Sequence, residues 1–168
     1  SARPVPDSRG LLLTCSGAMD AILYEVDDFS LLDRWIAVMQ RLLLLHPDVF
    51  KAGIVTAAIS DHRYYDCVLT EKYMGLINDN EEGYRNSSMV ALAGNLEGKM
   101  LLVHSLMDDN VHPQNTFQLT KAMIDAGKNI DLKIYPPGAH GVAYDMNSQM
   151  FLYNLYLEWL NENLKGTE

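Results

Sequence analysis

Short apolar runs alternate with longer amphipathic segments along most of this chain. Three runs rich in Val, Ile and Leu predict β-strands, at residues 52–59, 99–104 and 130–135. A fourth run, residues 11–15, lies between two glycines and predicts one further possible strand. Strands that are separated by helical segments are typical of an α/β domain with a largely parallel sheet.

Three longer segments carry apolar residues at helical spacing. Segment 32–45 begins beside Ser30 and Asp33, which resemble an N-cap pair, and segments 113–126 and 147–164 follow later strands. Their apolar stripes are Leu32, Trp35, Ile36, Met39, Leu42 and Leu43; Leu119, Ala122, Met123 and Ala126; and Leu152, Leu155, Tyr156, Trp159 and Leu160. We therefore expect three amphipathic helices that pack against the sheet.

Composition and charge narrow the class of protein. The chain has 168 residues, of which 48% are hydrophobic and 21% charged, so it is large enough to bury its own core. The formal net charge of −9 argues against binding to phosphate backbones or anionic lipid. Apolar runs such as residues 42–45 are far shorter than a membrane span, and residues 1–10 lack the apolar stretch of a signal peptide. We expect a soluble chain with no nucleic-acid partner.

The chain contains only two cysteines, Cys15 and Cys67, and they lack the spacing of metal ligands. The sequence therefore predicts neither a disulfide framework nor a metal site, and we expect no cofactor.

Two polar loops directly follow predicted strands. Loop 104–112 contains Asp108, and loop 136–141 contains His140. The carboxyl ends of parallel strands meet at one edge of a sheet, so this carboxylate and this imidazole could lie together there. An Asp that holds a His in one tautomer is the supporting half of a nucleophilic triad. The alternative is that Asp108 caps a turn and His140 is a surface loop residue between glycines, and spacing alone leaves both interpretations open.

Four stretches carry a more specific signal. They are HRYYDCVLTEKYMGL at residues 62–76, YRNSS at 84–88, DDNVH at 108–112 and AHG at 139–141. In this order and spacing they closely resemble successive motifs of the prolyl oligopeptidase family of serine peptidases, in its dipeptidyl peptidase IV-like branch. The resemblance implies that residues 31–168 are the C-terminal part of an α/β-hydrolase catalytic domain. Residues 1–30 would form an irregular arm with one possible strand.

The resemblance also implies roles for individual residues. Asp108 matches the triad aspartate and His140 the triad histidine, so we expect these side chains within hydrogen-bond distance of each other. Tyr65 and Asn110 match residues that line the substrate pocket, and Val111 matches a pocket wall. The implied substrates are peptides with a penultimate Pro or Ala. The family suggests a periplasmic or extracellular location, although the sequence itself leaves the compartment unknown.

The serine motif of the family is missing from its expected place. Counting back from residues 46–50, the motif Gly-Trp-Ser-Tyr-Gly-Gly should fall on residues 31–36, where Asp33 stands in the position of the serine. Such an elbow needs small residues because its turn is strained and tightly packed, and a carboxylate cannot perform the acyl transfer of a serine. We therefore expect a serine peptidase by family that is inactive as it stands. Two alternatives are a non-catalytic hydrolase-like scaffold for protein interaction and a truncated or rearranged N-terminal portion.

Another serine could replace the missing one. Ser16 follows the apolar run 11–15 and precedes Gly17, which is the local order of strand, serine and helix at an elbow. The leading glycine is absent, however, and a serine beside a glycine is more often part of a turn. Cys15 is interpreted as a small packed apolar residue.

Other departures concern the pocket and the sheet. The family usually has Tyr or Trp at His62, Tyr at Leu69 and Gly at Ser105, so the match to the proline pocket of the family is incomplete. Three or four parallel strands also leave an open edge, at strand 52–59. We expect a homodimer through this edge, because unpaired strand edges recruit other chains. The alternative is that the N-terminal arm covers the edge.

Overall fold

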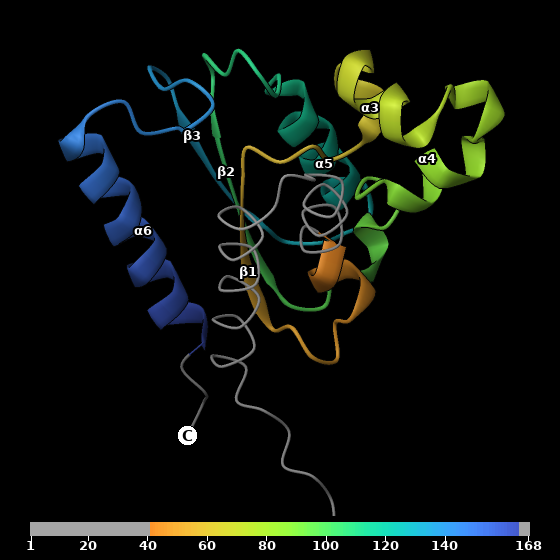
Figure 1. Ribbon diagram of the computed structural model, residues 1–168. Helices are drawn as coiled ribbons and strands as arrows, with labels where there is room; N and C mark the ends of the chain where they lie inside the picture. Colours follow the sequence, from red (N-terminus) through yellow and green to blue (C-terminus); the bar gives the residue numbers. More distant parts are fainter. Residues whose placement is uncertain (1–40, 165–168) are drawn as a thin grey trace, which may run out of the picture.

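The structure is a computed structural model and describes residues 41–164. After a helical stretch at residues 41–45, three strands, four α-helices and three short 3-10 helices, denoted η, follow one another in this part of the chain (Figure 1). In order they are β1 (Ala52–Thr56), η1 (His62–Tyr64), α3 (Cys67–Met74), η2 (Ile77–Asp79), α4 (Glu81–Ser87), η3 (Ala93–Asn95), β2 (Lys99–Ser105), α5 (Gln114–Asp125), β3 (Asp131–Tyr135) and α6 (Met146–Leu164).

The three strands form one parallel sheet in the order β1-β2-β3, which confirms the predicted α/β class. Ala52 pairs with Lys99 in the first ladder, and Leu101 pairs with Asp131 in the second. Parallel neighbours need a crossover connection, and here α3 and α4 lie between β1 and β2 in the chain, while α5 lies between β2 and β3. The predicted strand 52–59 is therefore real but ends three residues early, at Thr56.

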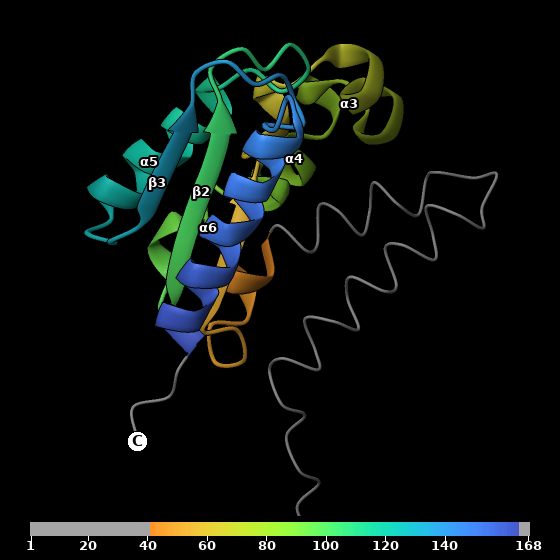
Figure 2. The same cartoon turned by 90° about the vertical axis from the view of Figure 1, so that its left-hand side faces the viewer.

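The central strand β2 is buried on both sides, as a nearly continuous apolar run predicts. Its residues alternate between two hydrophobic clusters: Met100 and Leu102 pack on the face that α5 covers, and Leu101 and Val103 on the face that α6 covers. Figures 1 and 2 show these two helices on opposite faces of the sheet. This arrangement is a three-layer α/β architecture.

Helix α6 crosses its face of the sheet and is fixed by polar contacts at the two outer strands of the part of the sheet that lies within residues 41–164. The hydroxyls of Thr56 on β1 and Tyr156 lie 2.7 Å apart, and Trp159 Nε1 donates to Asp131 Oδ2 on β3 at 2.7 Å. No helix among residues 41–164 is long and apolar enough to span a membrane.

The motif at residues 62–76 forms a compact helical insertion between β1 and β2. Asp66 caps α3 by accepting from Leu69 N at 2.8 Å, and Gly75, with φ of 73°, ends that helix. The buried hydroxyl of Tyr84 in α4 donates to the Gly75 carbonyl at 2.7 Å. Local capping residues thus place the segment that carries Tyr65.

The predicted helix 32–45 lies mostly outside the described residues. Residues 41–45 are helical, and Leu43 and Leu44 are buried against the α5 face of the sheet. The possible strand 11–15 and the arm 1–30 also fall outside the described range.

Candidate active site

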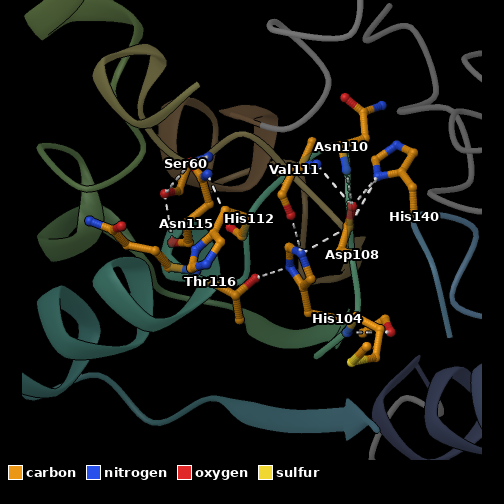
Figure 3. Close-up of polar contacts among 12 residues, drawn as sticks. Ser60, His104, Asp108, Asn110, Val111, His112, Asn115, Thr116 and His140 are labelled. Atoms are coloured by element: carbon orange, nitrogen blue, oxygen red, sulfur yellow. Dashed lines mark hydrogen bonds and ion pairs between the residues drawn. The ribbon is translucent and has the colours of Figure 1, made fainter. Parts of the chain in front are cut away.

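Asp108 and His140 meet at the carboxyl ends of β2 and β3. Asp108 lies in the loop after β2 and His140 in the loop after β3, and adjacent parallel strands bring the two loops together. His140 Nδ1 lies 3.0 Å from Asp108 Oδ2 and 3.2 Å from Oδ1 (Figure 3). The two side chains are thus within the hydrogen-bond distance that the resemblance implied.

The loop after β2 folds around the carboxylate of Asp108. Oδ1 accepts from the backbone N–H of Asn110 at 3.0 Å and from that of Val111 at 2.9 Å, while the side chain has no exposed surface. The turn-cap interpretation is therefore correct as a description of Asp108, but the same carboxylate also contacts His140. Capping orients the group, so the two interpretations are complementary.

The charge state of Asp108 follows from these contacts. Burial raises the pKa of the carboxyl, but hydrogen bonds from His140 and from the backbone of Asn110 and Val111 outweigh it, so the net pKa is lowered. Asp108 is therefore an anion at neutral pH and favours a proton on His140 Nδ1.

The loop that carries His140 is unusually tight. Val142 has φ of 64°, a value that β-branched residues rarely adopt, and its side chain is fully buried in the cluster under α6. Its N–H donates to the Ala139 carbonyl at 2.8 Å, and a Cβ on Gly138 would lie 1.9 Å from the Val142 carbonyl oxygen. Strained backbone of this kind persists where surrounding packing overdetermines it, and here burial of Val142 anchors the loop beside His140.

The three residues that match the substrate pocket of the family lie in or beside the loop that carries Asp108. Tyr65, which directly follows η1, donates its hydroxyl proton to Asn110 Oδ1 at 2.8 Å. This bond orients the Asn110 amide so that its Nδ2 group remains available as a donor. Val111 is buried, and its backbone groups bind Asp108 and His104, so it stabilises the loop between β2 and α5.

A buried polar network joins the β1 loop to the start of α5, and sequence reasoning did not identify it. Ser60 N–H donates to Asn115 Oδ1 at 3.1 Å, and Ser60 Oγ donates to the Asn115 carbonyl at 2.7 Å. Asn115 Nδ2 in turn donates to the Tyr64 carbonyl at 3.2 Å. The network places the segment of Tyr65 against the loop of Asn110. In the sequence, the only indication of this network was that two polar residues, Ser60 and Asn115, stand beside apolar segments.

His104 and Thr116 were also missed as site residues. Figure 3 shows His104 between Thr116 and Asp108, in the buried part of the site. His104 Nε2 lies 3.1 Å from Asp108 Oδ2. The available signal was a histidine inside an apolar strand that ends at the Asp108 loop.

The remaining predictions concern residues that the structure does not describe or chemistry that it does not display. Asp33, Ser16 and Cys15 lie outside residues 41–164, and Cys67 is exposed and free. Within the described range, no group of three or more His, Cys, Asp or Glu is arranged to hold a metal ion.

Comparison with solved structures shows the same fold in much larger proteins. Dipeptidyl peptidase 4 of Porphyromonas gingivalis matches 77% of this chain with a TM-score of 0.72 and 36% identity, and the match covers 18% of that chain. A putative dipeptidyl aminopeptidase IV of Bacteroides ovatus matches the same share of this chain with a TM-score of 0.72 and 30% identity. The sheet and its helices are therefore part of an α/β-hydrolase fold.

Sequence comparison gives the same result. Pig dipeptidyl peptidase 4 is 45% identical over 104 residues, which is 60% of this chain and 14% of the relative. A probable dipeptidyl-aminopeptidase B of Pyrenophora tritici-repentis is 36% identical over 119 residues, which is 70% of this chain and 13% of the relative. The chain thus spans about one seventh of these relatives. The family model described as the prolyl oligopeptidase family matches residues 37–167. The chain belongs to the prolyl oligopeptidase family and is similar to its dipeptidyl peptidase 4-like members.

Proposed function

We propose that residues 31–168 are the C-terminal part of a serine peptidase catalytic domain, in which Asp108 and His140 are the acid and base of the triad. The contact of His140 Nδ1 with the buried Asp108 carboxylate, at 3.0 Å, carries this proposal. It is supported by the position of both residues at adjacent strand ends and by the family to which the chain belongs.

His140 is suited to the role of a general base. A proton on Nδ1 is bound to Asp108, so the lone pair of neutral His140 is on Nε2, the opposite ring nitrogen. The side chain of His140 is 44% exposed, which leaves it accessible to a reacting group, whereas the side chain of Asp108 has no exposed surface. A buried carboxylate that carries its charge stabilises the imidazolium that forms when Nε2 takes a proton.

The proposed substrate is a peptide with a penultimate Pro or Ala. Asn110 supports a peptide substrate because the Tyr65 hydroxyl occupies its Oδ1 atom, which directs Nδ2 as a donor for a carbonyl oxygen. The preference for Pro or Ala rests on the resemblance to the family alone. A titration of the nitrogen-labelled chain with the dipeptide Ala-Pro tests it. We expect the amide signal of Asn110 to shift, and we expect a smaller shift for Tyr65→Phe, which lacks the orienting hydroxyl. An unchanged Asn110 signal at saturating dipeptide would contradict the assignment.

We further propose that the isolated chain forms no acyl-enzyme, because Asp33 stands where the family has its serine. Incubation with a fluorophosphonate probe tests this directly, with pig dipeptidyl peptidase 4 as the positive control. We expect no labelled residue by peptide mass mapping. A label on Ser16 would assign it as the nucleophile, and a label on any serine would refute the proposed inactivity.

The second candidate function is a non-catalytic, hydrolase-like scaffold for protein interaction, which Asp33 also favours. The two candidates differ in what the site retains. If the chain retains part of the triad site, adding the dipeptide should shift the nitrogen signals of His140. If the chain is a scaffold that has lost its site, the dipeptide should not bind.

A further inference from the structure

A second imidazole contacts Asp108 from the interior of the protein. His104 lies near the end of β2 and is completely buried. Its Nε2 atom lies 2.8 Å from the Val111 carbonyl oxygen and 3.1 Å from Asp108 Oδ2, and its Nδ1 atom lies 2.6 Å from Thr116 Oγ1. In Figure 3, His104 and His140 lie on different sides of the Asp108 carboxylate.

The neighbours of His104 determine its tautomer. Both groups near Nε2, a backbone carbonyl and a carboxylate, can only accept hydrogen bonds, so an unprotonated Nε2 would face two acceptors without a donor. The Thr116 hydroxyl beside Nδ1 can donate or accept. Neutral His104 therefore has its proton on Nε2 and accepts from Thr116 at Nδ1.

This arrangement places a group of the protein interior beside each oxygen of the Asp108 carboxylate. Oδ1 is bound by the backbone N–H groups of Asn110 and Val111, and Oδ2 lies beside the Nε2–H group of His104. His104 also binds the Val111 carbonyl, so it joins the end of β2 to the far end of the Asp108 loop. The carboxylate is thereby held in the rotamer that places Oδ2 3.0 Å from His140 Nδ1.

We propose that His104 is a positioning residue of the site: by donating Nε2–H to the Val111 carbonyl, beside Asp108 Oδ2, it holds the loop around the Asp108 carboxylate and thereby the Nδ1–H tautomer of His140. This inference rests on the proposed roles of Asp108 and His140. If His104 only filled the core, it would stabilise the fold without affecting the tautomer of His140, which it contacts only through Asp108.

Long-range proton–nitrogen correlation spectra of the nitrogen-labelled, full-length chain measure these tautomers directly. For the unmodified protein we expect His104 in the Nε2–H form and neutral His140 in the Nδ1–H form. His104 in the Nδ1–H form, or in a rapidly averaging mixture, would overturn the proposal.

Two substitutions of His104 by an amide residue test the contacts of its two ring nitrogens, Nε2 and Nδ1, one at a time. In His104→Gln the side-chain nitrogen takes the place of Nε2 and still reaches Val111 and Asp108, whereas in His104→Asn it takes the place of Nδ1 and reaches only Thr116. We expect His140 to keep its Nδ1–H tautomer in His104→Gln. In His104→Asn we expect the nitrogen signals of His140 to move to the averaged values of a free imidazole. Equal His140 spectra in the two folded variants would overturn the proposal.

The outcomes distinguish this proposal from the proposed function. Far-ultraviolet circular dichroism first establishes that each variant folds. If His104→Asn does not fold, two measurements still test the positioning role: the tautomer of His104 in the unmodified chain and the tautomer of His140 in His104→Gln. Loss of the His140 Nδ1–H tautomer in His104→Gln also counts against the positioning role. If the unmodified chain lacks a His140–Asp108 bond, the proposed triad fails, whatever the role of His104. The fluorophosphonate experiment tests the proposed function separately, because its result does not depend on His104.

Discussion

The carboxylate of Asp61 is fully buried, and hydrogen bonds to both of its oxygens offset the cost of burying its charge. Oδ1 accepts from the N–H and Nε–H of Arg63 at 2.9 and 2.8 Å, and Oδ2 accepts from the Ser88 hydroxyl. Burial raises the pKa of Asp61, but the hydrogen bonds of Arg63 and Ser88 outweigh it and bring the pKa below its ordinary value of 3.8. This cluster links η1 to the end of α4 and so supports the segment that carries Tyr65.

A depressed pKa makes stability depend on pH in a defined direction. The charged form of Asp61 is favoured in the folded state, so its contribution is present above the unfolded pKa of about 3.9 and is lost as pH falls through the lower, folded pKa. We expect Asp61→Asn to lower the free energy of unfolding by about 1–3 kcal/mol at neutral pH. Urea unfolding at a series of pH values should show this difference shrink toward acid. A difference that stays constant down to about pH 3 would contradict the linkage.

Gly138 allows two parts of the His140 loop, residues 138 and 142, to pack closely against each other. A Cβ at this position would lie 1.9 Å from the carbonyl oxygen of Val142, a backbone atom that cannot move without disturbing an already strained residue. We expect Gly138→Ala to lower the free energy of unfolding by about 1–3 kcal/mol and to separate His140 from Asp108.

Gly94→Ala is the matched control, because a Cβ on Gly94 meets no atom within 4 Å. We expect a change within about 0.5 kcal/mol for this control. Chemical denaturation measures both variants, and the nitrogen signals of His140 report the site. Equal stability of the two alanine variants would show that the His140 loop relaxes freely.

Asp108 and His140 could be predicted from the sequence because each directly follows a recognisable strand and a family motif. His104 could not, since a histidine within the apolar run of β2 gives no sign of which loop carbonyl and carboxylate will surround it. The strained backbone of Val142 was equally hidden, because a valine does not ordinarily adopt a positive φ.

At the level of elements, hydrophobic pattern predicted the strands and the two later helices within three residues. The pattern worked because β2 is buried on both faces and α5 on one, so burial and periodicity coincide. Helices α3 and α4 were not predicted from periodicity. They are short and capped by Asp66 and Asn80, and side-chain capping rather than an apolar stripe determines where they begin.

Helix α6 offers a direct test of which face stabilises the domain. Trp159 is 7% exposed, packs against β2 and donates to Asp131 on β3, whereas Leu157 on the same helix is 60% exposed. We expect Trp159→Ala to lower the free energy of unfolding by about 3–5 kcal/mol. The control Leu157→Ala should change it by no more than about 0.5 kcal/mol. Urea denaturation of the two variants measures this contrast, and similar losses would mean that both faces of α6 are covered.

At the scale of the whole molecule, the edge of the sheet at β1 bears on self-association. Within residues 41–164, β1 pairs with β2 alone. Ala57 N–H donates to the Val103 carbonyl, and alternate residues of a parallel strand face opposite neighbours, so the N–H of Ile54 faces away from β2. A row of such groups favours pairing with another chain.

We therefore expect the chain to form a homodimer through β1, and Ile54→Pro tests this interface. Proline removes the outward N–H but no bond to β2, and Gly53 before it has no Cβ to clash with the ring. The control Ile54→Ala loses the side chain and keeps the N–H. Light scattering should give twice the mass of 18.9 kDa for the unmodified chain and for Ile54→Ala, and a single mass for Ile54→Pro.

Circular dichroism must show that Ile54→Pro is folded for its mass to be interpreted. A monomeric unmodified chain at tens of micromolar would contradict the dimer and favour an edge that the chain covers itself. A dimer that survives Ile54→Pro would exclude β1 as the interface. It would direct attention to α6, where Met146, Met150, Tyr153 and Leu157 are exposed at alternating spacings of four and three residues, the repeat by which one helix packs along another.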